Sequence, residues 1–268
     1  MSAPGEKQPV SGWQRTLVIA IDRSIYGLSK HWLALFNIVA LFYVTLPIVA
    51  PVLLKAGVEG PARVIYTAYS PLCHQMAQRS FFVLGKQPAY PRAIAGTDYT
   101  PIEAYIGDIP EYEGVTPDNW PSFFAASRSF KGNEVMGYKM ALCERDIGIY
   151  GFVLIGGLLY AMLRNRFNIK PLPLLLFIII GILPIAIDGF SQLISYWVTP
   201  LDGSEAAGFL ASIQNLFPLR ESTPTMRAFT GGLFGFMLVW LTYPHLNSGM
   251  MGTEKSLGAK LRKAGAIK

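Results

Sequence analysis

The stretch that decides the fold is HWLALFNIVALFYVTLPIVAPVLL, residues 31–54, which carries no charged side chain between Lys30 and Lys55. A hydrocarbon core about 30 Å thick needs about 17–25 apolar residues in each crossing helix. Backbone groups in lipid must bond within their own segment, and a helix achieves this in a single stretch. The chain is therefore expected to cross a membrane here.

Three further stretches meet the same criterion, at residues 147–163, 171–187 and 229–246. The composition agrees, because 51% of the 268 residues are apolar and only 15% are charged, whereas a soluble domain carries about 25% charged residues. We expect an all-α integral membrane protein whose membrane domain, residues 31–246, contains four transmembrane helices.

Lysine and arginine predict the orientation. The N-terminal segment, the loop 164–170 and the tail 247–268 are rich in cations, whereas residues 55–146 and 188–228 carry a small excess of acids. Cytoplasmic segments of membrane proteins carry the excess of Lys and Arg. We expect a multi-pass protein of the plasma (inner) membrane with both termini cytoplasmic. The net charge of +6 then reflects topology, so the bilayer, and no nucleic acid, is the expected partner.

The N-terminal segment divides into two parts. Residues 1–12 are polar and are expected to form a disordered tail. In residues 13–30, the apolar Trp13, Leu17 and Ile21 recur at helical spacing. This pattern predicts an amphipathic helix lying on the inner membrane surface before the first crossing. The basic tail 247–268 is expected on the same side.

The two outer segments, 55–146 and 188–228, are expected to form an extracytoplasmic cap. Within the first, residues 88–131 read as an insertion rich in proline, acids and tyrosine. A structureless loop of this length is uncommon in a compact domain, and the tyrosines argue against full disorder. The insertion is expected to be a small cap or a docking surface for a protein partner.

Four short motifs resemble those of a known family. They are CHQ with RSF at 73–81, CERDIGIY at 143–150, DG with Gln192 at 188–192, and RES with Arg227 and TG at 220–231. In this order they resemble an uncharacterised bacterial family of predicted multi-pass membrane proteins, a domain of unknown function. The resemblance covers residues 62–86 and 139–243, and it implies the architecture but no activity. In that family a further cysteine often stands where this chain has Asp146.

Antiparallel neighbouring helices bring certain helix ends to the same depth. The start of the second crossing, the end of the third and the start of the fourth should therefore meet on the outer side. Asp146, Asp188 and Arg227 lie at these ends. A polar cluster at the mouth of an apolar bundle is where a functional site is expected.

The two cysteines, Cys73 and Cys143, both fall on the expected outer side, where disulfides persist. A disulfide between them is the favoured interpretation. The alternatives are a metal site with Cys73, His74, Cys143 and Asp146 as ligands, zinc being the fitting ion, and two unpaired buried thiols. Because Cys73 and His74 are adjacent, a shared metal would require a turn between them.

The charged residues near the outer mouth allow two interpretations. Asp188 and Arg227 are expected to form a structural ion pair, since charges at the hydrocarbon edge tend to pair. Alternatively, Arg145, Arg220 and Arg227 could bind an anionic group. His74 is interpreted either as a general base or as a histidine hydrogen-bonded within a turn.

Two functions follow from these observations. The leading hypothesis is a non-catalytic membrane module, such as an accessory subunit whose outer loops bind a partner. The alternative is an enzyme, with or without zinc, that uses His74, Asp146 and Asp188 on a lipid or isoprenoid-like substrate at the outer interface. A transporter is less well supported, because the four crossings contain no ionisable residue at mid-membrane.

Overall fold

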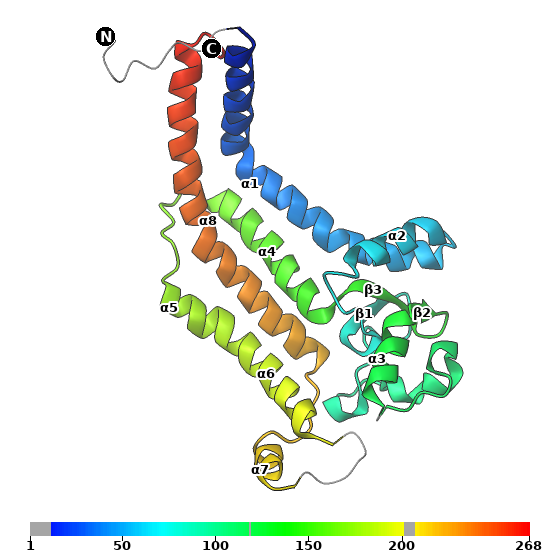
Figure 1. Ribbon diagram of the computed structural model, residues 1–268. Helices are drawn as coiled ribbons and strands as arrows, with labels where there is room; N and C mark the ends of the chain where they lie inside the picture. The colour runs from blue at the N-terminus through cyan, green and yellow to red at the C-terminus, as the bar shows by residue number, and fades with distance from the viewer. Residues whose placement is uncertain (1–11, 118, 201–206) are drawn as a thin grey trace, which may run out of the picture.

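The computed structural model describes residues 12–117, 119–200 and 207–268 (Figure 1). The chain forms a bundle of long helices with a smaller folded module at one end. Most of the N-terminal tail expected to be disordered lies outside the described residues.

Two helices are much longer than a membrane crossing requires. Helix α1, Gly12–Lys55, has 44 residues and α8, Pro224–Lys263, has 40. At 1.5 Å per residue they extend about 66 and 60 Å. The first half of α1 and the last half of α8 project together beyond the other helices (Figure 1), joined by an ion pair of 2.7 Å between Asp22 and Lys260. The helix expected over 13–30 therefore continues directly into the first crossing instead of forming a separate element.

Two further helical segments complete the bundle. They are α4, Glu144–Leu163, and the continuous segment made of α5 (Leu174–Leu176), the π-helical η6 (Phe177–Ile182) and α6 (Leu183–Val198). The π-turn directly precedes Pro184, whose missing N–H frees a carbonyl in the preceding turn. The sequence predicted that the outer segment begins at Asp188. Because α6 continues to Val198, Asp188 instead lies inside a helix.

Three helical segments in the described part of the chain are long and apolar enough to cross a membrane. They are Gly12–Lys55, Glu144–Leu163 and Leu174–Val198. The fourth expected crossing, 229–246, lies within α8, which is not among them. Its glycines, Pro244 and His245 lower the hydropathy of that stretch.

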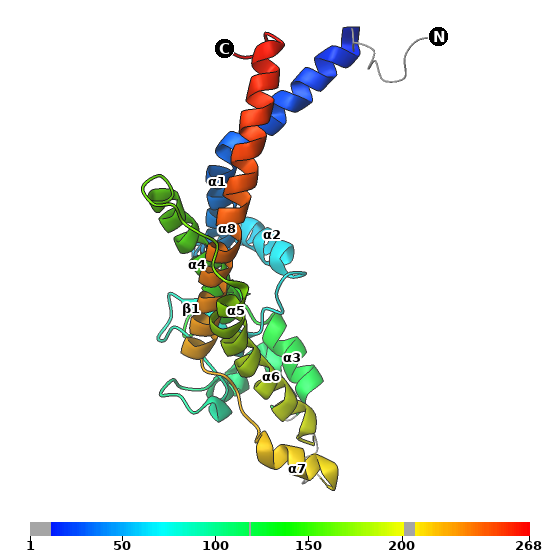
Figure 2. The same cartoon turned by 90° about the vertical axis from the view of Figure 1, so that its left-hand side faces the viewer.

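Those glycines have a packing role against α4. A Cβ at Gly231 would overlap the carbonyl oxygen of Arg145, and one at Gly235 would overlap that of Ile149. From the α4 side, a Cβ at Gly148 would overlap the carbonyl oxygen of Ala228. Small residues allow two helix backbones to approach closely in this way, so α4 and α8 form a tight pair (Figure 2).

The expectation of an all-α fold is wrong in one respect. Three antiparallel strands, β1 (Ser80–Val83), β3 (Gly137–Cys143) and β2 (Gly132–Asn133), form a small sheet in the order β1-β3-β2. Ser80 pairs with Cys143. This pairing connects residues far apart in the sequence. It lies at the last residue of β3, directly before α4 begins at Glu144.

The sheet belongs to a folded module of residues 59–143, which we call the cap module. It also contains α2 (Glu59–Tyr69), α3 (Trp120–Ser129) and five short 3₁₀ helices at Ala77–Arg79, Ala93–Ala95, Ile102–Ala104, Ile106–Asp108 and Pro110–Tyr112. Its core includes the buried rings of Tyr90, Tyr112, Phe123 and Phe130. These aromatic side chains explain why the insertion 88–131 folds. Residues 188–228, the other segment expected on the outer side, contain α7, Phe209–Leu216.

Candidate functional site

The turn after α2 positions the first cysteine motif. Gln75 adopts a positive φ of 51°, a conformation uncommon for a residue other than glycine. Its side-chain nitrogen donates hydrogen bonds to the carbonyl oxygens of Tyr66 (2.9 Å) and Ala141 (3.0 Å). These bonds hold the turn that carries Cys73 and His74 against β3.

A buried lysine also holds the turn at Gln75 in place. The Lys139 side chain is fully buried, and its ammonium donates hydrogen bonds to three carbonyl oxygens. The acceptors are Gln75 (2.6 Å), Ser127 (2.9 Å) and Arg128 (2.9 Å). A buried charge is tolerated only when it is well bonded, so this lysine joins the turn, α3 and β3 into one rigid unit.

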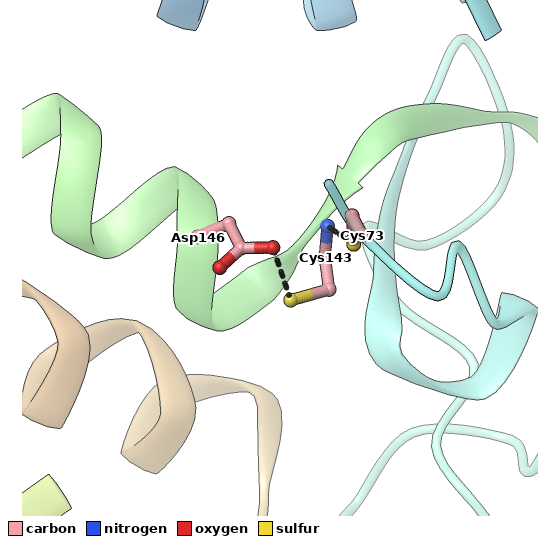
Figure 3. A group of neighbouring side chains, drawn as sticks. All are labelled: Cys73, Cys143 and Asp146. Carbon is pink, nitrogen blue, oxygen red and sulfur yellow. Dashed lines mark hydrogen bonds between the residues drawn. The ribbon is translucent and has the colours of Figure 1, made fainter. Parts of the chain in front are cut away.

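Cys73, Cys143 and Asp146 meet where the cap module joins α4 (Figure 3). One potential ligand atom from each lies within 4.8 Å of the other two. The Cys143 backbone N–H donates to the Cys73 sulfur at 3.2 Å, and the Cys143 thiol donates to Asp146 Oδ2, also at 3.2 Å. Cys143 and Asp146 are three residues apart at the start of α4, which places their side chains on one face.

Both cysteines are free thiols in this structure, and both are buried. The disulfide favoured by the sequence is not formed, because the Cys143 sulfur points toward the Asp146 carboxylate (Figure 3). Hydrogen bonding from Cys143, helped by nearby His74, lowers the pKa of the Cys73 thiol. The arrangement therefore favours a thiolate at Cys73, the form that binds metals.

The three side chains open into a cavity of about 270 Å³. It is also lined by His74, Arg145 and other polar residues, the full set being Leu72, Cys73, His74, Arg79, Cys143, Arg145, Asp146, Gln192 and Arg227. His74 is not within the close group of three, but its Nδ1 is buried and has no hydrogen-bond partner among the described residues. A fourth donor is thus available beside the other three.

The donor set fits zinc. Zinc accepts thiolate, imidazole and carboxylate ligands about 2.0–2.3 Å away in a tetrahedron, so neighbouring donor atoms lie about 3.3–3.8 Å apart. The separation of 3.2 Å between Cys143 and Asp146 is close to that range, and the Cys73 sulfur needs only a small movement. The hydrogen bond with Cys73 and burial raise the pKa of the Cys143 thiol, so a metal bound here would have to displace that proton.

Asp188 has different partners from those expected. It is buried and accepts hydrogen bonds from Arg145 and, at 3.1 Å, from Arg220. The predicted pair with Arg227 is therefore wrong. Asp188 is engaged by two arginines and does not line the cavity with His74 and Asp146, so the catalytic group proposed from the sequence is not assembled.

Arg227 instead joins two glutamates. It bonds Glu144 at 3.0 Å and also Glu221, and both carboxylate side chains are completely buried. Glu221 additionally accepts from Arg79 (2.7 Å), Gln192 (2.8 Å) and Tyr196. Arg145 and Arg220 share the carboxylate of Asp188, and Arg227 is paired with Glu144 and Glu221, so each arginine of the anion-binding group expected from the sequence already has a carboxylate partner.

Sequence reasoning missed several members of this network. Glu144 and Arg79 were not singled out as site residues, although Glu144 lies inside the CERD motif and Arg79 inside RSF. Only their position between charged neighbours in those motifs could have indicated them. Lys139 carried no signal at all, because a lysine on a short strand is ordinarily exposed.

Fold and site thus define a mainly helical membrane protein whose folded cap module meets the bundle at a cysteine- and arginine-lined cavity. Residues 125–241 match the family described as a predicted membrane protein (DUF2085). The chain is also similar to an uncharacterized protein of Methanocaldococcus jannaschii, with 26% identity over 180 residues that cover 67% of each chain. No solved structure matches the chain.

These comparisons confirm the resemblance to an uncharacterised family of membrane proteins. The matched range contains the motifs that begin at Cys143, Asp188 and Arg220, whereas the CHQ motif at Cys73 lies before it. Neither the family description nor the relative's name carries an activity, so the enzyme considered from the sequence gains no support from them.

Proposed function

We propose that this membrane protein is a non-catalytic module that holds a zinc ion at the junction of its cap module and its helical bundle. The ligands are Cys73, Cys143 and Asp146, with His74 as the fourth donor. The observation that carries the proposal is the convergence of the first three donor atoms within 4.8 Å. In this role the metal is structural, and the cap module presents a surface to a protein partner.

A metal at this junction would link three separate elements. Cys73 lies in the turn after α2, Cys143 ends β3, and Asp146 lies in the first turn of α4. Three donors of the chain converge, and His74 is the proposed fourth; with all four positions filled by the chain the site would be structural, whereas catalytic zinc sites leave one position open. Binding would therefore stabilise the cap module on the bundle.

The test is the metal content of protein purified in mild detergent without chelator, with free thiols counted on the same sample. The proposal predicts about one zinc per chain, lost in Cys143→Ser and reduced in Asp146→Asn. Asp108→Asn is the matched control, because Asp108 is an exposed acid of the cap module and its variant should keep the zinc. Absence of zinc from the wild-type protein, with either two free thiols or a disulfide, would contradict the proposal.

The membrane arrangement is part of the same proposal. Residues 229–246 of α8 form a fourth crossing, since α8 packs against α4 and α1 and its Val239 and Tyr243 share a buried cluster with Trp32 and Tyr160. The chain then lies in the plasma membrane with the cap module outside and both termini in the cytoplasm. The cation-rich segments support this orientation.

Sidedness is tested by cysteine labelling in intact cells with a membrane-impermeant maleimide. Lys86→Cys, exposed on the cap module, should be labelled, and Lys263→Cys, exposed at the end of α8, should be labelled only after the membrane is opened. The unsubstituted protein is the control, because both native cysteines are buried. Labelling of Lys263→Cys in intact cells would contradict the orientation.

A further inference from the structure

A second cavity lies at the opposite end of the crossing helices. It has a volume of about 650 Å³ and is formed by the loop after α4 and the middle of α8. Its lining comprises Tyr160, Arg164, Asn165, Arg166, Phe167, Asn168, Ile169, Lys170, Pro171, Pro244, His245, Asn247, Ser248 and Met251. We call it the basic cavity.

The helix ends place the basic cavity at a membrane surface. Helix α4, one membrane-capable segment, ends at Leu163, and the next begins at Leu174. The loop between them must therefore lie where both leave the hydrocarbon region. A hydrogen bond of 3.0 Å from the Leu172 N–H to the Trp240 carbonyl holds this loop against α8, so the cavity opens at the boundary between lipid and water.

The charge of the basic cavity is entirely of one sign. Arg164, Arg166 and Lys170 line it, and no acid does. Within the described residues none of the three has an ion-pair partner. Arg164 is held in place by a neutral group, donating to Asn247 Oδ1 at 3.1 Å. The other end of the bundle differs, because each arginine there forms an ion pair with at least one carboxylate. These arginines are Arg79, Arg145, Arg220 and Arg227.

The other lining groups complete a recognisable pattern. Asn165, Asn168 and Ser248 offer uncharged hydrogen-bond donors, and His245 adds a further one. Phe167 and Met251 are exposed apolar side chains at the same place. Converging cations and donors suit a phosphate group, while apolar side chains beside them suit an acyl chain.

We propose that the basic cavity binds the phosphate headgroup of an anionic phospholipid, with Arg164, Arg166 and Lys170 as the binding residues. Basic pockets between membrane helices on the cytoplasmic side bind such headgroups. The lipid then connects the α4–α5 loop to α8 at the inner surface. The site does not depend on the zinc site, which lies at the other end of α4.

The test measures lipid retention by native mass spectrometry of the full chain in detergent. Phosphatidylglycerol is the anionic probe, and phosphatidylcholine, which carries a phosphate but no net charge, is the comparison. The wild-type protein should retain phosphatidylglycerol preferentially. The double variant Arg166→Gln/Lys170→Gln should bind it about ten- to thirtyfold more weakly, as expected for the loss of two cations at a membrane surface.

Two controls make the result decisive. Arg166 and Lys170 are exposed, so the double variant should fold, which its elution volume and its zinc content would verify. Lys263→Gln removes an exposed cation from the C-terminal end of α8, outside the lining of the basic cavity, and should retain phosphatidylglycerol normally. Equal retention of the two lipids, or an equal loss in Lys263→Gln, would overturn the proposal. Displacement of the lipid by millimolar inorganic phosphate would identify a free-anion site and would also overturn it.

Discussion

Replacing Arg227 tests the buried ionic network most severely. This side chain is 3% exposed, and it bonds two carboxylates, Glu144 and Glu221, that are 0% exposed. Arg227→Gln leaves both carboxylates without their shared cation in a region that excludes water. Removing one member of a buried ion pair costs about 3–5 kcal/mol, so a large loss of stability is expected.

The assay is thermal unfolding in detergent, followed by intrinsic fluorescence. For a chain of this size, 1 kcal/mol corresponds to a change in Tm of about 2–4 °C, so Arg227→Gln should lower Tm by about 6–20 °C. The matched control is Arg63→Gln. Arg63 pairs with Glu59 at 3.4 Å, but the two side chains are 74% and 70% exposed, and such a pair contributes little. Its Tm should change by less than about 2 °C.

A double variant shows whether the stability lost in Arg227→Gln comes from a buried carboxylate left without its cation or from lost packing. Glu221 keeps Arg79 as a cationic partner, so Arg227→Gln/Glu144→Gln removes the carboxylate that Arg227→Gln leaves without an ion pair and should recover part of the lost stability, because the two residues are directly bonded. If the double variant is less stable than Arg227→Gln by the full cost of Glu144→Gln alone, the two positions act independently. That result, or equal Tm changes in Arg227→Gln and Arg63→Gln, would refute the reasoning.

Three further variants test other parts of the fold by the same unfolding assay. Lys139→Met removes the donor of three buried hydrogen bonds and should cost about 2–4 kcal/mol; an unchanged Tm would contradict this role. Burial by itself raises the pKa of Glu221, but its two arginine partners outweigh it and hold that pKa below the ordinary value. Stability from this charge should therefore be present above pH 4.5 and lost as the pH falls below it, and Glu221→Gln should reduce that loss. Gly235→Ala, which meets the α4 backbone, should cost about 1–3 kcal/mol, whereas Gly151→Ala, which faces open space, should cost far less.

The crossing helices were predictable because lipid imposes a simple requirement on the sequence. An uncharged stretch such as 31–54 has few structures available in a hydrocarbon solvent, and α1, α4 and α5–α6 contain the first three expected stretches. The fourth lies within α8, whose glycines lower its hydropathy and at the same time allow close contact with α4. Hydropathy alone therefore does not establish whether residues 229–246 of α8 cross the membrane, because the glycines that lower it also serve packing.

The sheet of the cap module was beyond the reach of sequence patterns, although a cap had been expected in this part of the chain. Its sheet pairs Ser80 with Cys143, and such long-range pairing leaves no local period. The prediction of which charged residues form pairs was wrong for a related reason. Helix ends predicted which residues share a depth, but the rotation of each helix decides that Asp188 faces Arg145 and Arg220, while Arg227 faces Glu144 and Glu221.

The cysteine motif predicted a site near Cys73 and Cys143 but left its form open between a disulfide, a metal site and two unpaired thiols. Placing both cysteines on one side was enough to predict that they could meet. The orientation of the Cys143 sulfur toward Asp146 supports the proposed metal site, and it depends on how β3 leads into α4, which the sequence pattern does not indicate.

X-ray absorption at the zinc edge of the purified protein tests the central claim most directly. The account predicts two sulfur neighbours at about 2.3 Å and two oxygen or nitrogen neighbours at about 2.0–2.2 Å, with Cys143→Ser losing the metal. A zinc spectrum without sulfur neighbours, or wild-type protein without zinc, would contradict the account.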